Sequence, residues 1–163
     1  MLFSRQTPRD SALAIAALAF LTIAGAWVFQ YAGYPPCDLC LEQRYAYYAG
    51  VPLALLIAAA AARAPRALLA AGFALLVAIF LYNAGLAIYH SGVEAKYWTG
   101  PTACTGALAP VGGDLLKQLE SVRVVRCDEV GLRVLGFSLA NWNIVISAAL
   151  AALSAAALLR RGR

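Results

Sequence analysis

The stretch ALLAAGFALLVAIFLYNAGLAIY, residues 67–89, runs for 23 residues without a charged side chain. An α-helix rises about 1.5 Å per residue, so a helix of this length crosses the hydrocarbon layer of a bilayer, which is about 30 Å thick. Similar uncharged runs occupy residues 11–29, 45–62 and 137–159. They are rich in Ala and Leu and lack the alternation of lipid-facing strands, which disfavours a barrel. The sequence therefore predicts an all-α membrane protein, a bundle of four transmembrane helices in a single membrane domain.

The composition excludes an ordinary soluble domain, because 63% of the 163 residues are hydrophobic and only 13% are charged. The formal net charge is +5, and many of the basic residues gather at the termini and in the turn between the second and third runs: Arg5, Arg9, Arg63, Arg66, Arg160, Arg161 and Arg163. By the positive-inside rule this side is cytoplasmic, so the loops at about 30–44 and 90–136 face outward. Membrane anchoring explains these arginines better than nucleic-acid binding does.

All four cysteines, Cys37, Cys40, Cys104 and Cys127, fall in the two outward-facing loops. Their confinement to the side of an oxidising compartment indicates disulfide chemistry. A zinc site is disfavoured because 22 residues separate the members of the second pair, whereas structural zinc sites present two close pairs; no metal is expected. For Cys104 and Cys127 the spacing alone leaves a static staple and an exchangeable bond equally open.

The first pair, in Cys37-Asp38-Leu39-Cys40, has the spacing that redox proteins use for exchangeable disulfides. Because Pro35-Pro36 fits an extended approach to a helix, we expect the second helix to begin at about Cys37 to Cys40. The dipole and free N–H groups of a helix start favour a thiolate. Arg44 follows Cys40 by one helical turn and adds a positive charge beside that sulfur.

These residues resemble the disulfide bond formation protein B (DsbB) family of the bacterial inner membrane. The resemblance covers nearly the whole chain and is carried by CDLCLEQR at 37–44, YHSGVE at 89–94, then Trp98, Gly100, Pro101 and Cys104, and finally CDE at 127–129 and LGFSLANWN at 135–143.

The resemblance implies a quinone-linked protein-thiol oxidoreductase. In such proteins the Cys104–Cys127 disulfide accepts electrons from a periplasmic DsbA-type oxidoreductase, with Cys104 forming the mixed disulfide. The electrons then pass to Cys37 and Cys40, and Cys40 interacts with bound ubiquinone, menaquinone being the alternative. Arg44 matches the arginine of the family's quinone site. A vitamin K epoxide reductase-like enzyme and a disulfide-stapled membrane protein without turnover stay open as alternatives.

Other polar residues lie near the membrane surface or inside the helices. His90, the only histidine, is a candidate for hydrogen bonding to the quinone or for proton transfer, and equally for a polar interfacial residue. We expect Glu94 to pair with Lys96 or Arg44. Residues 113–125 have the pattern of a short amphipathic helix in the outer interface. We expect three asparagines to make polar contacts inside the bundle: Asn83, Asn141 and Asn143.

Overall fold

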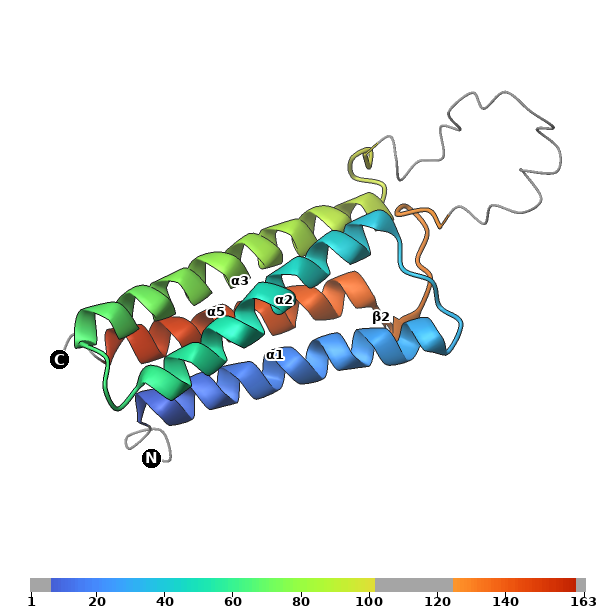
Figure 1. The fold of residues 1–163 in the computed structure, drawn as a ribbon. Coiled ribbons are helices and arrows are strands. Elements are labelled where there is room, and N and C mark those ends of the chain that lie inside the picture. The colour runs from blue at the N-terminus through green and yellow to red at the C-terminus, as the bar shows by residue number, and fades with distance from the viewer. Residues whose placement is uncertain (1–6, 102–124, 161–163) are drawn as a thin grey trace, which may run out of the picture.

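The computed structural model describes residues 7–101 and 125–160. Four long helices and one small hairpin make up this part of the chain, in the order α1 (Pro8–Tyr31), α2 (Asp38–Ala60), α3 (Arg66–Glu94), β1 (Arg133–Val134), β2 (Phe137–Ser138) and α5 (Leu139–Leu159). The four helices lie side by side in one bundle (Figure 1). The predicted apolar runs at 11–29 and 67–89 therefore fall within helices, and those at 45–62 and 137–159 fall mostly within one.

The helices begin where the sequence supplies a cap. Thr7 caps α1, where its Oγ1 accepts from the Asp10 N–H at 3.2 Å and the Asp10 carboxylate accepts from the Thr7 N–H at 3.0 Å. Ser138 caps α5 in the same way, through the Asn141 N–H. Cys37 caps α2, which confirms the expected start of that helix.

Within the described residues, three helices are long and apolar enough to cross a membrane: α1, α3 and α5. Helix α2 falls short of them in hydropathy because its first turns carry Glu42, Gln43 and Arg44. It nevertheless runs alongside the other three (Figure 1). The chain is therefore an all-helical membrane protein.

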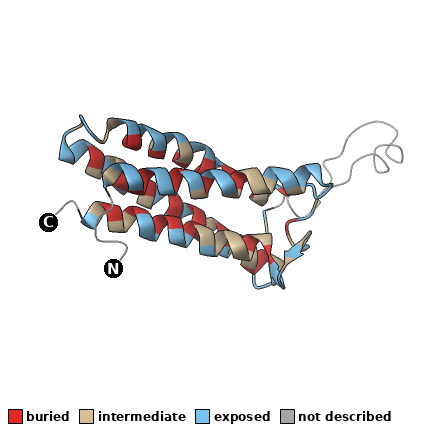
Figure 2. Cartoon of the chain, turned by 90° about the horizontal axis from the view of Figure 1, so that it is seen from below, coloured by how far each residue is buried: buried red, intermediate tan, exposed pale blue. Residues whose placement is uncertain are grey.

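Buried and exposed residues alternate along each helix of the bundle (Figure 2). The buried side chains are mostly small or apolar, and many large apolar side chains are exposed. Phe73, Leu76 and Phe80 of α3 have no exposed area, whereas Leu56 of α2 is 67% exposed and Tyr82 of α3 is 73% exposed. Large apolar residues on the outside of a soluble protein would be unfavourable, but they suit contact with lipid.

A two-residue turn at Leu135 and Gly136 forms a hairpin that the sequence analysis did not predict. Both residues have positive φ angles, of 53° and 85°, as a type I′ turn requires. Arg133 pairs with Ser138, and Val134 pairs with Phe137. Trp142 of α5 donates from Nε1 to the Val134 carbonyl at 2.9 Å, so the hairpin is fastened to the helix that follows it.

Two predictions concern residues outside the described part of the chain. These are the amphipathic helix at 113–125, of which only the last residue is described, and the position of Cys104.

Candidate functional site

Cys37 and Cys40 lie at the first turn of α2, with their sulfur atoms 2.7 Å apart. The Cys37 sulfur also accepts a hydrogen bond from the Cys40 N–H at 3.3 Å, so the helix start holds the two groups together. The pKa of Cys40 is lowered, first by the hydrogen bond from the Cys37 thiol and further by the charge of Arg44. The pKa of Cys37 is raised because its proton is held in that bond and because the thiol is buried. Of the pair, Cys40 is therefore the sulfur that carries negative charge first.

His90 comes from the last turns of α3 and faces the same thiols. Its side chain is only 3% exposed, and Nε2 lies 3.6 Å from the Cys37 sulfur. Glu94, one turn later, has a carboxylate oxygen 3.9 Å from that Nε2. The ligand atoms of Cys37, Cys40 and His90 lie within 4.8 Å of one another, close enough for a thiophilic ion. The structure thus brings together three of the residues that the sequence singled out.

Gln43 connects this cluster to the interior of the bundle. Its side-chain nitrogen lies 2.8 Å from Nδ1 of His90 and 3.1 Å from the Leu39 carbonyl oxygen. Its side-chain oxygen accepts a hydrogen bond from Asn143 of α5. The sequence analysis did not select Gln43, although its position three residues after Cys40 places both on one face of α2.

The polar chain continues from Asn143 into the membrane interior. The Tyr47 hydroxyl donates to Asn143 and lies 3.2 Å from the Ser147 hydroxyl. Asn83 of α3 donates to Ser147 at 2.9 Å, and Ser91 donates to Asn141. The predicted bundle contacts of the three asparagines are therefore confirmed.

Arg44 is buried, with 8% of its area exposed, and it binds the end of α1. Its guanidinium group donates to the side chain of Gln30 at 2.6 Å and to the Ala26 carbonyl at 3.5 Å. These bonds hold the positive charge between α1 and α2, close enough to lower the pKa of Cys40.

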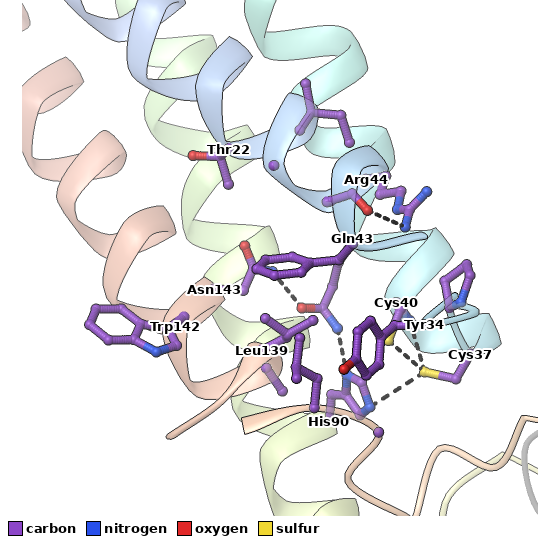
Figure 3. Close-up of a pocket in the computed structure, with 18 of the residues that line it drawn as sticks. Thr22, Tyr34, Cys37, Cys40, Gln43, Arg44, His90, Leu139, Trp142 and Asn143 are labelled. Carbon is purple, nitrogen blue, oxygen red and sulfur yellow. Dashed lines mark hydrogen bonds between the residues drawn. The ribbon is translucent and has the colours of Figure 1, made fainter. Parts of the chain in front are cut away.

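A cavity of about 340 Å³ opens beside the thiols, between α1, α2 and α5 (Figure 3). Cys37, Cys40, Gln43, Arg44 and His90 supply polar and sulfur groups to its wall. Most of the remaining wall is apolar, including Leu21, Phe29, Leu139, Trp142 and Ile146. This combination of an apolar cavity and a few convergent polar groups is typical of a small-molecule site.

Cys127, in the described segment that begins at residue 125, also packs at this end of the bundle. It is 1% exposed and forms one buried cluster with Cys37, Leu39 and Val93. Cys127 is disulfide-bonded, whereas Cys37 and Cys40 are free thiols. The structure therefore places a cysteine of the second loop against the first pair.

The predicted partner of Glu94 is wrong. Lys96 binds Asp128 at 2.6 Å instead, and Arg44 binds Gln30. Helix α3 ends at Glu94, and Lys96 has a φ of 62°, so the chain turns away from the helix before the lysine. The carboxylate of Glu94 lies beside the ring of His90 instead.

A bundle of apolar helices with vicinal thiols and a third cysteine at one end defines a membrane protein of thiol–disulfide chemistry. The model of one protein family, Disulfide bond formation protein DsbB, matches residues 8–157, and the chain belongs to this family. Neither the curated proteins nor the solved structures include a match to the chain. The family assignment makes the chain a membrane protein of disulfide bond formation, of the disulfide-oxidoreductase type. Its members use quinones and a thiol oxidoreductase partner.

Proposed function

We propose that the chain oxidises a periplasmic DsbA-type oxidoreductase and passes the electrons through two cysteine pairs to ubiquinone, or to menaquinone, in the bacterial inner membrane. One observation carries the proposal: the Cys37–Cys40 pair lines an apolar cavity and also packs against Cys127. A water-soluble thiol partner and a lipid-soluble oxidant need such an arrangement, because no single dithiol readily meets both.

The cavity suits the head group of a quinone. Its volume of about 340 Å³ falls within the range of roughly 300 to 1,000 Å³ of small-molecule sites. Leu21 lines the cavity and is 66% exposed on α1, so the cavity reaches the lipid-facing surface of the bundle. Arg44 is the residue that would bind a ring oxygen, and His90 would border the ring on the side of the thiols. A quinone bound there would supply the two-electron, two-proton oxidation of the thiol pair.

The thiol chemistry follows from the order of the sulfurs. The partner's dithiol reduces the disulfide between Cys104 and Cys127 through a mixed disulfide with Cys104, and the partner leaves oxidised. The Cys127 thiolate then attacks the Cys37 sulfur of an oxidised first pair, and Cys40 leaves as the thiolate. A low pKa improves a leaving group, and the Arg44 charge, which is one of the causes that lower the pKa of Cys40, is still present when Cys37 is in a disulfide, so it favours this direction of attack. Closure of Cys104 with Cys127 releases Cys37 and leaves the first pair reduced. The Cys37–Cys40 disulfide would then form again as the pair gives two electrons and two protons to the quinone, so each cycle moves two electrons and two protons from the partner to the quinone.

We also propose that α2 crosses the membrane with the other three helices, which makes four transmembrane segments. Arg9, Arg63, Arg66 and Arg160 lie at the end of the bundle opposite the thiols, where the positive-inside rule places the cytoplasm. Both termini would then be cytoplasmic, and the cysteine loops would be periplasmic.

The test uses the purified full chain in lipid vesicles with ubiquinone and a reduced DsbA-type protein. The loss of quinone absorbance is followed for the wild type and for four single variants, in which Cys37, Cys40, Cys104 or Cys127 becomes Ser. We expect quinone reduction by the wild type and none by any variant. Without a working Cys104 the partner should stay reduced.

The outcomes separate this proposal from a static staple. A stapled protein would leave both the partner and the quinone unchanged in the wild type. Quinone reduction that persisted in Cys40→Ser would exclude the assigned route, because the electrons would then bypass the sulfur beside Arg44.

A further inference from the structure

We propose that Gln43 is a positioning residue that fixes the tautomer of His90, with the ring proton on Nε2 and directed at the Cys37 sulfur. Both side chains are buried, Gln43 with 5% and His90 with 3% of its area exposed. Water therefore has little part in their hydrogen bonding, and the protein groups around them decide where the protons lie.

The neighbours of Gln43 determine which end of its amide faces His90. Its side-chain nitrogen lies 3.1 Å from the carbonyl oxygen of Leu39, which can only accept a hydrogen bond. Its side-chain oxygen receives the amide N–H of Asn143 on the other side. Turning the amide over would place two oxygens together at Leu39 and two nitrogens together at Asn143. The group that faces His90 at 2.8 Å is therefore an N–H donor.

The N–H of Gln43 that faces Nδ1 determines which ring nitrogen of His90 carries the proton. Nδ1 must accept, so in the neutral imidazole the proton lies on Nε2. Nε2 has the Cys37 sulfur at 3.6 Å, within reach of a hydrogen bond to sulfur, and the Glu94 carboxylate at 3.9 Å, beyond the reach of one to oxygen. The Nε2–H can therefore donate to the Cys37 sulfur (Figure 3), and the backbone carbonyl of Cys127 is a second acceptor beside the ring.

A proton on Nε2 of His90 would stabilise a negative charge on the Cys37 sulfur. This role of His90 rests on the proposed function. The Cys37 sulfur is the second of the pair to lose its proton, and it must do so before it can close the disulfide with Cys40. Two donors then stabilise its thiolate, the Cys40 N–H and the His90 ring N–H. His90 acts here by donating a hydrogen bond and does not act as a base. The same proton occupies the nitrogen that a metal ion would need, which makes the cluster of two thiols and one imidazole a poor metal site as it stands.

The tautomer can be measured directly because the chain contains one histidine. Protein labelled with ¹⁵N in histidine, in lipid bilayers, gives one pair of ring nitrogen signals, and their shifts identify the protonated nitrogen. We expect the proton on Nε2 in the wild type and on Nδ1 in Gln43→Glu, because a carboxylate accepts where the amide donates. Tyr47→Phe alters the polar chain beyond Asn143 and serves as the control, with the proton expected to stay on Nε2.

A proton on Nδ1 in the wild type would overturn the proposal, and so would a Gln43→Glu signal identical to that of the wild type. The second readout is quinone reduction under saturating quinone and partner, where we expect Gln43→Glu to lower kcat by at least about tenfold, as for the loss of a hydrogen bond to a charged group, with little change in the KM for quinone. If the wild type reduced no quinone, the proposed function would fail while the nitrogen signals still decided the role of Gln43.

Discussion

The ammonium group of Lys96 lies 2.6 Å from the carboxylate of Asp128, the residue that follows Cys127. Arg126 binds the same carboxylate at 2.9 Å, so Asp128 accepts from both sides. Lys96 follows the end of α3, two residues after Glu94. The ion pair therefore ties the segment of the second-loop cysteine to the helix that carries His90.

Replacing Asp128 by Asn should loosen the contact between Cys127 and Cys37, because the anchor of the segment loses its charge. We expect slower electron transfer between the two cysteine pairs and an unchanged rate of reaction of the partner with Cys104. Rapid-mixing measurements with reduced partner separate these two steps. Glu129→Gln is the matched control, since Glu129 is 69% exposed and contacts only Arg126 among the ion pairs of the described residues. Equal slowing in both variants would contradict the anchoring role.

The same carboxylate predicts a pH dependence of stability. The hydrogen bonds from Arg126 and then Lys96 hold the pKa of Asp128 well below its usual range. A group whose pKa is lower in the folded state stabilises the fold fully above its unfolded pKa, about 3.9, and loses this contribution as the pH falls below that value. The difference in unfolding free energy between wild type and Asp128→Asn should be constant from neutral pH to about pH 5 and shrink in more acidic solution. High salt should reduce it, because Lys96 is 63% exposed.

The sequence predicted the helices well because each of them is specified locally. Uncharged runs and the Pro35-Pro36 approach to α2 depend only on neighbouring residues. The sequence could therefore predict that α2 begins next to Cys37. The contact between Gln43 and His90 was not, because it joins residues 47 positions apart on two helices. Whether two such side chains meet depends on the rotation of each helix about its axis, which a single sequence does not reveal.

The error at Glu94 has a local origin. Lys96 is its neighbour in the sequence, but α3 ends between them and the positive φ of Lys96 redirects the chain. The hairpin was missed because its turn uses Leu135 and Gly136 rather than the more usual Asn-Gly pair.

The hydroxyl of Tyr47 should contribute to stability through its place in the buried polar chain. Tyr47 is 3% exposed, donates to Asn143 and lies beside Ser147. We expect Tyr47→Phe to lower the free energy of unfolding by about 0.6 to 1.7 kcal/mol, which are the average and the largest value measured for hydrogen bonds between membrane helices. Tyr48→Phe is the control, because Tyr48 is 43% exposed and accepts only at the surface, from Trp27. Unfolding in mixed micelles would give both values, and a larger loss at Tyr48 would be inconsistent with the assignment.

Gly92 in α3 leaves room for the ring of Trp98. A Cβ atom at this position would lie 1.9 Å from the ring, and Trp98 is held in place by a 2.7 Å hydrogen bond to the Tyr89 carbonyl. We expect Gly92→Ala to lower the free energy of unfolding by about 1 to 3 kcal/mol, the usual effect of overpacking. Gly85→Ala, in the same helix, has nothing within 4 Å and should be neutral or stabilising by up to about 1 kcal/mol. Similar effects at both positions would show that Trp98 moves aside freely.

Arg44 should affect quinone binding more than it affects folding. Its main partner, Gln30, is exposed and can bind water once the guanidinium group is gone, so the fold loses little. We expect Arg44→Gln to raise the KM for quinone by at least about tenfold, as for the loss of a charged hydrogen bond, with a small change in Tm. Gln30→Ala keeps the positive charge but removes its anchor, so we expect it to retain most quinone use, and Arg44→Lys should fall between the two. Steady-state quinone reduction and thermal unfolding in the same lipid mixture provide both measurements. A role in quinone binding predicts that Arg44→Gln raises KM while Tm changes little. If Tm fell as strongly as quinone binding weakened, the arginine would stabilise the fold and would not specifically bind the quinone.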